Sequence, residues 1–406
     1  MNKCPHFDLV NPNSYSNGVP FDDLATLRIH CPVSKQHDSV LDEDFWAITR
    51  KEDIDFISTN PAIFSSEAEL AINEDLDAGQ KDALRMQIIN MDPPKHLRYR
   101  NIVRAAFTPR AVAVYEARFR EVAKEIVDKV ASKGECEFVS EVAAALPLIA
   151  ICELMGIAQE DRHLMYDWVH TTTTDPDATE EERTLCAMQV FEYATKLAQQ
   201  HRSNPQPGSI IATLLDGVVE EEGLTDEEFC WFFLILIVGG IETTRTMTSH
   251  GMRLLMEHPD QLQQLVDDPG LIEEAIEEML RYNPPFIMMR RTAMEDIELS
   301  GQHIKQGDKI LMFYHAANRD KDLFGADADD FDITRAQRVD LARTHRAFGF
   351  GEHFCLGNRL ARLELKIVFS ELLPRLRNPR LAGEVEYLKS SFINGITAMP
   401  IQFDAE

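Results

Sequence analysis

The sequence predicts a mainly α-helical fold with a small β portion. From about residue 109 to residue 280, apolar residues recur at helical spacing and glycine is scarce. Residues 296–313 instead contain three short β-prone runs separated by Ser-Gly and Gln-Gly turn signals. The helical pattern breaks at Pro176 and at residues 204–208 but resumes at once on either side, so neither break indicates a linker between domains. We therefore expect one domain over residues 1–406.

Composition excludes several classes of protein. The chain has 68 acidic and 41 basic residues, a formal net charge of −27, and so no overall electrostatic reason to bind nucleic acid or anionic lipid. Its seven cysteines contain no Cys-x-x-Cys pair, which argues against a disulfide framework, a zinc site or an iron–sulfur cluster. The amino terminus shows no signal peptide, and the apolar run 229–241 is shorter than the roughly 18 residues of a membrane span. We expect a cytoplasmic protein without a membrane anchor.

The first part of the chain mixes strand and helix signals. Residues 45–49 (Phe-Trp-Ala-Ile-Thr) are rich in strand formers, and residues 51–58 follow as a short helix. Pro93-Pro94 favours a helix start immediately before His96.

The later elements have equally local signals. Thr225 and Glu228 form a capping-box pattern at the start of a helix that runs to about Glu257, some 32 residues or roughly 48 Å. The runs 297–299, 303–305 and 309–313 predict a small β meander. An irregular segment then leads to a last helix from Asn358 to about residue 376.

The strongest chemical signal is the run Phe-Gly-Phe-Gly-Glu-His-Phe-Cys-Leu-Gly at residues 348–357. Its glycines allow a tight backbone path around Cys355, and the following helix places an N-terminus beside the sulfur, which favours a thiolate. A thiolate is what an electron-rich axial ligand to haem iron requires. The alternative is a glycine-rich turn with a buried cysteine. At these residues the chain resembles the cytochrome P450 family, which implies a triangular prism of helices and haem b (iron protoporphyrin IX) as cofactor.

A second resemblance concerns a charged cluster. Glu278 and Arg281 are three residues apart on one face of a predicted helix, a spacing that by itself is that of a surface ion pair. In the family such a pair joins a third arginine and braces the haem-binding core. The resemblance implies that Arg335 is this third member and that the role is structural.

The long predicted helix carries two adjacent glycines, Gly239 and Gly240, at a cost of about 1 kcal/mol each. They indicate either close packing or a local widening that admits a ligand. Glu242 and Thr243 follow, and they resemble the family's acid–alcohol pair that relays protons to dioxygen. Thr243 would hold dioxygen and water, and Glu242 would connect them to bulk water. The alternative is a satisfied polar patch on a buried helix.

Haem carboxylates need cations and hydrogen-bond donors. His96 and Arg100 share a helix face at i, i+4. The resemblance implies that they bind the haem propionates together with Arg291 and His353. Arg290 is the alternative to Arg291, because the two are adjacent.

The chain carries no flavin, nicotinamide or iron–sulfur fingerprint, so its electrons must come from other proteins. Positive charge is concentrated in two segments: residues 335–366 hold seven basic and three acidic residues, and residues 92–110 hold five and one. We expect an acidic ferredoxin, supplied by a ferredoxin reductase, to bind there.

Apolar residues near these motifs are candidates for a substrate pocket. They are Leu234, Ile235, Val238, Gly239, residues 286–289 including Met288, Phe392 and Ile393. The chain looks most like the bacterial branch that hydroxylates sterol and methyl-branched lipid side chains, at residues 90–92, 107–112, 242–245, 312–314 and 394–396. Ile241 stands where that branch tends to carry asparagine, which leaves the substrate open.

The resemblance implies a haem-thiolate monooxygenase that uses O2 and two ferredoxin electrons to hydroxylate an unactivated C–H bond of a sterol side chain or branched lipid. A terpenoid, fatty acid or aromatic substrate remains an alternative, as does a peroxide-driven haem-thiolate hydroxylase. A haem-binding sensor or lipid carrier is the non-enzymatic alternative. The presence of Thr243 argues against a carrier.

Overall fold

The computed structural model describes residues 4–405 except 75, 176–177, 206–209 and 219–222. The helices are α1 Phe21–His30, α2 Lys51–Thr59, α3 Ala78–Leu84, α4 Lys95–Val103, α5 Pro109–Ala113, α6 Glu116–Ala131, α7 Ala145–Met155, α8 Arg162–Val169, α9 Glu180–Ser203, α10 Ile210–Asp216, α11 Asp226–Glu257, α12 Pro259–Asp267, α13 Ile272–Tyr282, α14 Tyr314–Ala317, α15 Lys321–Phe324, α16 Leu341–Thr344 and α17 Asn358–Leu372. The strands are β1 Val33–Asp38, β2 Glu43–Ile48, β3 Phe64–Ser65, β4 Glu135–Glu137, β5 Met288–Ala293, β6 Ile297–Leu299, β7 Gln302–Ile304, β8 Lys309–Phe313, β9 Arg377–Leu381, β10 Glu386–Tyr387, β11 Ile396–Ala398 and β12 Pro400–Asp404.

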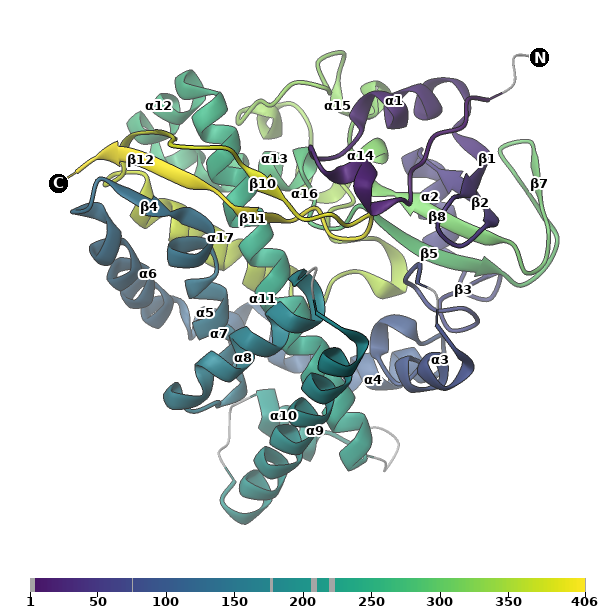
Figure 1. The fold of residues 1–406 in the computed structure, drawn as a ribbon, viewed down its shortest axis with the longest axis horizontal. Coiled ribbons are helices and arrows are strands. Elements are labelled where there is room, and N and C mark those ends of the chain that lie inside the picture. Colours follow the sequence, from purple (N-terminus) through teal and green to yellow (C-terminus); the bar gives the residue numbers. More distant parts are fainter. Residues whose placement is uncertain (1–3, 75, 176–177, 206–209, 219–222, 406) are drawn as a thin grey trace.

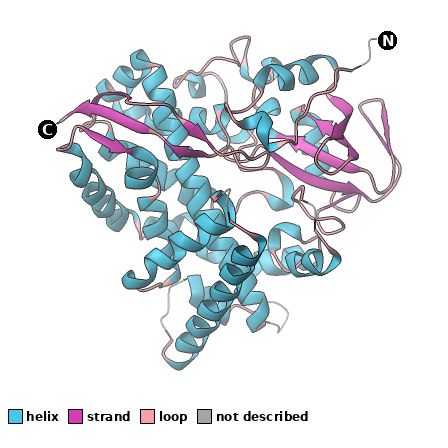
Figure 2. Cartoon of the chain, viewed as in Figure 1, coloured by secondary structure: helices cyan, strands magenta, loops and turns pink. Residues whose placement is uncertain are grey.

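The predicted mixture of many helices and few strands is confirmed, with helices making up 56% of the structure. Figures 1 and 2 show the helices gathered around α11, with the largest sheet at one side of the molecule. The main hydrophobic core is built from buried faces of α6, α7, α9, α11, α13 and α17.

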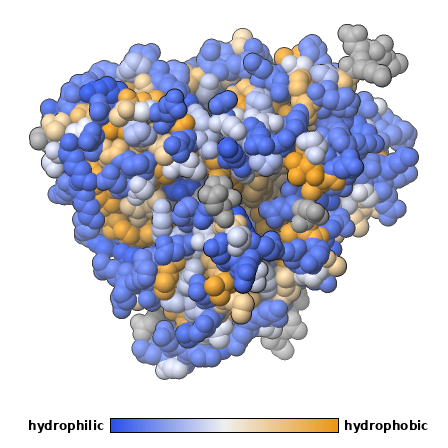
Figure 3. Space-filling view, viewed as in Figure 1, coloured by the Kyte–Doolittle hydropathy of each residue, from blue (hydrophilic) through white to orange (hydrophobic). Residues whose placement is uncertain are grey.

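Helix α11 begins and ends as predicted. The Thr225 side chain accepts from the Glu228 backbone N–H and the Glu228 side chain accepts from the Thr225 N–H, so the capping box is formed. The helix is long and apolar enough to cross a membrane, but 56% of its most apolar window is buried inside the protein. Apolar side chains on the face drawn in Figure 3 form scattered patches among hydrophilic ones. We therefore describe α11 as the central core helix.

The early predictions of a strand at 45–49 and a helix at 51–58 are confirmed by β2 and α2. The predicted meander is wrong in one respect: β6 and β7 pair as a hairpin, but β8 joins a different sheet. That sheet has the order β1-β2-β8-β5-β3, with β2 and β8 parallel and the other neighbours antiparallel. All five residues of β8 are buried, which suits a central strand rather than the edge of a small meander.

Two local expectations differ from the structure, and a third is not tested by it. Strand β4 interrupts the stretch predicted as helical because it pairs with β12, more than 250 residues later in the chain. The last helix ends at Leu372, before strand β9 begins. The predicted breaks at Pro176 and at residues 206–208 lie outside the described residues.

Cysteine pairing is also different from expectation. Cys4 and Cys31 form a disulfide, whereas the other five cysteines are free. The fold of residues 4–31 brings the Cα atoms of Cys4 and Cys31 to 6.0 Å, a proximity that spacing along the chain does not reveal.

Candidate active site

One cavity brings together side chains from α4, α11, β5 and the loop before α17. Of the residues predicted from sequence to bind a cofactor or take part in catalysis, the following line it: His96, Arg100, Thr243, Arg291, His353 and Cys355. They come from positions as far apart as 96 and 355, so their convergence is a property of the fold and not of local sequence.

The loop that carries Cys355 depends on its glycines. Gly349 and Gly351 have φ of +70° and +69°, a region that side chains disfavour, and a Cβ at Gly351 would lie 2.2 Å from the carbonyl oxygen of Ser58. The Cys355 N–H donates to the Phe348 carbonyl at 2.9 Å and closes the loop.

This loop directs positive charge at the sulfur. Burial raises the pKa of the Cys355 thiol, but hydrogen bonds from the N–H groups of Gly357 and Asn358 and the nearby Arg100 guanidinium act in the opposite direction. The thiol therefore sits beside donors that stabilise a thiolate, the form that binds a metal.

A second group of side chains that line the cavity combines two arginines with two imidazoles. The rings of His96 and His353 lie 4.1 Å apart. Burial, together with the neighbouring arginines, lowers the pKa of His96 to about 4 and that of His353 to about 2, so both rings are neutral near pH 7. They therefore serve as hydrogen-bonding groups, while Arg100 and Arg291 carry the positive charge.

Strand geometry decides between the two adjacent arginines. Side chains alternate across β5, and Met289 and Arg291 line the cavity. Arg290 lies toward carboxylates on the other side, among them Glu43 and Glu69.

These residues fit a flat apolar group that carries carboxylates and a metal. The Nδ1 atom of His96 is buried and has no hydrogen-bond partner among the described residues, so it is free to bond to a ligand. Two guanidinium groups, of Arg100 and Arg291, face the same cavity, and Cys355 supplies a sulfur ligand.

Helix α11 forms one wall, and its two glycines act differently. A Cβ on Gly240 would lie 2.4 Å from the Cδ1 atom of Ile151 on α7, so this glycine allows close helix packing. A Cβ on Gly239 would meet no atom of the described part of the chain within 4 Å, and Gly239 lines the cavity. Both glycines line the cavity, and both interpretations apply: Gly240 allows close helix packing, and Gly239 leaves open space in the cavity.

Glu242 and Thr243, which follow the two glycines on α11, point in different directions. Thr243 lines the cavity, and its hydroxyl donates to the Gly239 carbonyl at 2.7 Å. Glu242 is not among the described residues that line the cavity; it is buried and accepts from Arg245 at 2.7 Å and from the Thr246 hydroxyl at 3.3 Å. Burial raises the pKa of the Glu242 carboxyl, and the Arg245 charge partly offsets this.

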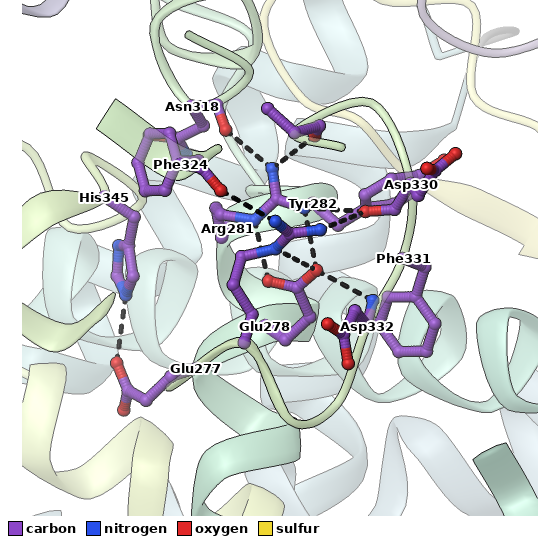
Figure 4. A network of polar contacts seen from close by, with 12 residues as sticks. Glu277, Glu278, Arg281, Tyr282, Asn318, Phe324, Asp330, Phe331, Asp332 and His345 are labelled. Carbon is purple, nitrogen blue, oxygen red and sulfur yellow. Dashed lines mark hydrogen bonds and ion pairs between the residues drawn. The ribbon is translucent and has the colours of Figure 1, made fainter. Parts of the chain in front are cut away.

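The three residues expected to form a brace are in direct contact (Figure 4). Glu278 accepts from both Nε and Nη2 of Arg281 at 2.7 Å and from Nε of Arg335 at 3.1 Å, and all three side chains are fully buried. The two guanidinium groups also donate to the backbone carbonyls of Asn318, Phe324, Asp327, Ala328 and Asp330. A buried ion cluster is stable only when its hydrogen bonds are satisfied in this way.

A second ion pair, which the sequence did not reveal, joins the brace helix α13 to α17. Glu277 accepts from both Arg362 nitrogens, Nε and Nη2, and from Nε2 of His345 at 3.0 Å. His345 Nδ1 accepts from the Ala347 N–H at 3.2 Å, and burial lowers the His345 pKa, so this imidazole is a neutral donor. The cluster therefore ties the brace helix to the helix that follows Cys355.

This cluster makes stability depend on pH. Burial alone would raise the pKa of Glu277, but the hydrogen bonds from His345 and Arg362 outweigh it and bring the pKa to about 2. A depressed carboxyl pKa contributes stability above the usual value near 4.5, and this is lost as pH falls toward 2. We expect Glu277→Gln to lower the free energy of unfolding by on the order of 3 kcal/mol at pH 7, and this difference from the wild type should shrink below pH 4.5. Urea unfolding of the wild type and the variant measures it.

The matched control is Glu273→Gln on the same helix. Glu273 is 69% exposed and pairs with Lys366, so Glu273→Gln should lower the free energy of unfolding by less than about 1 kcal/mol. A Glu277→Gln deficit that stays constant from pH 7 to pH 3 would contradict the assignment.

Several predicted pocket residues do not line the cavity. Ile235 and Gly239 do, but Leu234, Val238, Met288, Phe392 and Ile393 are not among the described residues of its wall. On α11 the cause is the rotation of the helix about its axis, because the face toward the cavity carries residues 235, 236, 239, 240, 243 and 244. On β5 the cause is the alternation of side chains along a strand, because Met288 faces the opposite side from Met289. Phe392 packs behind the wall, with its ring 5.0 Å from that of Phe286.

Other cavity residues were not predicted. They are Ile88, Ile89, Phe107, Ile151, Phe232, Leu236, Tyr314 and Glu364, among others. Glu364 is a buried carboxyl whose Oε2 has no hydrogen-bond partner among the described residues, and burial raises its pKa well above the usual range. Phe107, Leu236 and Tyr314 lie within or beside the motifs and the others lie outside them, but no local pattern shows which of these side chains face the cavity.

Comparisons with known proteins bear on this site. A family model described as Cytochrome P450 matches residues 148–380. The chain is 33% identical to a steroid C26-monooxygenase of Rhodococcus jostii (strain RHA1), over 98% of this chain and 84% of the relative. It is 36% identical to a methyl-branched lipid omega-hydroxylase of Mycobacterium tuberculosis (strain CDC 1551 / Oshkosh), over 93% and 90%. It is 34% identical to a linalool 8-monooxygenase of Pseudomonas putida, over 96% and 97%.

The fold has a similar counterpart among solved structures. A Mycobacterium marinum cytochrome P450 in complex with pseudoionone superimposes with a TM-score of 0.88 at 30% identity, over 99% of this chain and 100% of the other.

Proposed function

The chain belongs to the cytochrome P450 family and is a haem-dependent monooxygenase, and on this premise we propose that it hydroxylates an unactivated C–H bond in the side chain of a steroid or a methyl-branched lipid. The observation that carries the proposal is the composition of one part of the cavity wall. It is apolar and built from Ile88, Ile89, Phe232, Ile235, Leu236, Phe286 and Met289. Such a wall accepts a hydrophobic molecule.

The residues of the chain divide into binding and positioning roles. Cys355 would be the axial iron ligand, and His96, Arg100, Arg291 and His353 would bind the carboxylates of haem b. When bound, the haem iron activates dioxygen. The apolar wall excludes water and orients the substrate.

Thr243 is the group best placed to manage protons in the cavity. Its hydroxyl donates to Gly239 and retains its lone pairs to accept from a water molecule in the cavity. Glu242, one residue earlier, is the proposed proton source, held by its ion pair with Arg245.

Replacing Thr243 with alanine should uncouple electron use from product. The hydroxyl would be gone while the cavity keeps its shape, so NAD(P)H consumption should continue and product per NAD(P)H should fall by about tenfold or more, with hydrogen peroxide accumulating. Oxygen uptake, peroxide and product are measured together in the reconstituted system. Thr243→Ser, which keeps the hydroxyl, is the control, and equal coupling in all three proteins would refute the role.

We further propose that the electron donor is a ferredoxin, supplied by a reductase, and that the protein works in the cytoplasm. The proposed contact surface is smaller than the two basic segments. Most basic residues of 335–366 form ion pairs with acidic residues of the chain itself, so their charge is already compensated. Arg335, Arg338, Arg343, Arg346, Arg362 and Lys366 all form ion pairs. Within residues 92–110 and 335–366, the exposed arginines without an ion pair among the described residues are Arg104, Arg110 and Arg359. Two of these, Arg104 and Arg359, line a surface depression that also reaches Cys355.

Reversing charge at this depression should slow electron transfer from an acidic ferredoxin. We expect Arg104→Glu with Arg359→Glu to reduce the second-order rate of reduction by about tenfold at low salt, with the difference shrinking as salt is added. Lys305→Glu, on the exposed turn between β7 and β8, makes the same type of charge change elsewhere and should leave the rate unchanged. An equal effect at Lys305 would show that net charge alone matters.

The substrate class is tested by optical titration of the ferric protein. A low-to-high-spin shift with a steroid that has a branched side chain is the expected result. A shift only with terpenoids such as linalool would favour the second candidate, which the Pseudomonas putida relative and the pseudoionone complex support.

A further inference from the structure

Beyond Thr243, helix α11 carries a buried histidine that contacts the carboxy-terminal segment of the chain. His250 lies seven residues after Thr243, two turns along the same face and about 10 Å away along the axis. It is buried, and its Nε2 lies 2.7 Å from the backbone carbonyl oxygen of Asn394. Nothing in the proposed reaction uses this imidazole.

Asn394 in turn holds a part of the chain that reaches the cavity. Its backbone N–H donates to the Pro285 carbonyl at 2.8 Å. Two residues earlier, the Phe392 carbonyl accepts from the Ile287 N–H at 2.9 Å, and Ile393 forms a β-bridge with Phe286. Residues 392–394 therefore lie along residues 285–287 as a short two-stranded contact.

The side chain of Asn394 adds a second attachment. Its amide nitrogen lies 3.1 Å from Nε2 of His315, a fully buried residue of α14. Burial lowers the pKa of His250 to about 3 and that of His315 well below its usual value, so both rings are neutral. A neutral His250 that donates from Nε2 forms a directional hydrogen bond without a buried charge.

Residues 285–287, which pair with residues 392–394, contribute to the wall of the cavity. Pro285 and Phe286 line it, and the Phe392 ring packs 5.0 Å behind that of Phe286. Because the two segments are joined by backbone hydrogen bonds, movement of residue 394 would move Phe286.

We propose that His250 is a positioning residue for ligand selectivity: its hydrogen bond to the Asn394 carbonyl holds residues 392–394 in place and thereby sets the position of Phe286 in the cavity. The proposal rests on the proposed function of this cavity. It assigns selectivity to a residue that lines no part of the cavity itself.

The test compares two iron-binding azoles in the purified holoprotein. 4-Phenylimidazole must fit its phenyl ring into the cavity, whereas imidazole is small, so the ratio of their dissociation constants reports on the wall. We expect His250→Leu to raise the dissociation constant of 4-phenylimidazole about tenfold and that of imidazole less than twofold. His250→Gln, which keeps an N–H donor, should recover most of the loss.

Two further variants separate positioning from general destabilisation. Thr248 is equally buried on α11, but its hydroxyl donates within the helix to the Thr244 carbonyl at 2.9 Å, so Thr248→Val should leave the azole ratio unchanged. In a Phe286→Ala background, His250→Leu should have little additional effect, because both act through the same side chain. Faster hydrogen exchange in residues 388–396 is expected with His250→Leu only.

An unchanged azole ratio in His250→Leu, or full additivity with Phe286→Ala, would overturn the proposal. A wild-type protein that binds azoles but shows no spin shift with any steroid or lipid would instead count against the proposed substrate. A protein without a thiolate spectrum would count against the cofactor assignment. The three failures are therefore distinguishable.

Discussion

Replacing Cys355 with alanine is expected to abolish monooxygenase activity and the red-shifted spectrum of the reduced carbon monoxide complex. Cys355 is the one cysteine among the described residues that line the cavity, and the other sulfur there, the thioether of Met289, cannot form a thiolate. Thiolate donation sets the reactivity of the iron, so no neighbouring residue can replace it. The measurement is the reduced carbon monoxide spectrum, followed by turnover with a ferredoxin and reductase.

The fold should survive this change. The Cys355 backbone N–H still reaches the Phe348 carbonyl, and the following helix is unchanged, so the far-ultraviolet circular dichroism should match that of the wild type. Cys152→Ala is the control, because this buried thiol on α7 has its pKa raised to about 12 and lies outside the described cavity wall. A normal thiolate spectrum in Cys355→Ala would remove the basis of the site.

The second large effect concerns the brace. We expect Glu278→Gln to lower the free energy of unfolding by about 3–5 kcal/mol, because it leaves Arg281 and Arg335 as buried guanidinium groups without a counter-charge. Haem content should fall with it, since the brace supports the segment between α13 and Cys355. Urea unfolding followed by tryptophan fluorescence gives the free energy, and the pyridine haemochrome gives the haem content.

Arg338 supplies the comparison. It forms two ion pairs, with Asp327 and Asp332, but is 44% exposed, so Arg338→Gln should cost less than about 1 kcal/mol. If Glu278→Gln fails to fold, Arg335→Lys keeps the positive charge and loses part of the hydrogen-bond set, and it should give an intermediate loss. Equal losses of unfolding free energy in Glu278→Gln and Arg338→Gln would contradict the claim that the buried brace contributes more to stability than an exposed ion pair.

Motifs that depend on neighbouring residues were predictable. The glycines around Cys355 allow the tight backbone path of a ten-residue loop. The Thr225–Glu228 capping box determines where α11 begins. The pairing of Glu278 with Arg281 follows from helix geometry alone. These features involve groups within a few residues of one another, so backbone geometry and side-chain type are sufficient.

Prediction was weaker where the partner lies far away in the chain. The placement of β8 beside β2 and β5, and the Glu277 cluster with His345 and Arg362, join segments separated by tens to hundreds of residues. Which residues of α11 face the cavity was also unpredictable, because that depends on the rotation of the helix against its neighbours. Leu234 and Val238 were expected in the wall for this reason and are not among its described residues.

The sequence by itself therefore determined the mainly helical class, the family resemblance and the residues of each local motif. Only the tertiary structure decided which of these residues share a cavity, that Arg291 rather than Arg290 faces it, and that Thr243 faces it while Glu242 turns toward Arg245. The physical reason is that helix rotation and strand alternation turn adjacent residues to opposite sides, and only long-range packing selects the side that becomes the cavity.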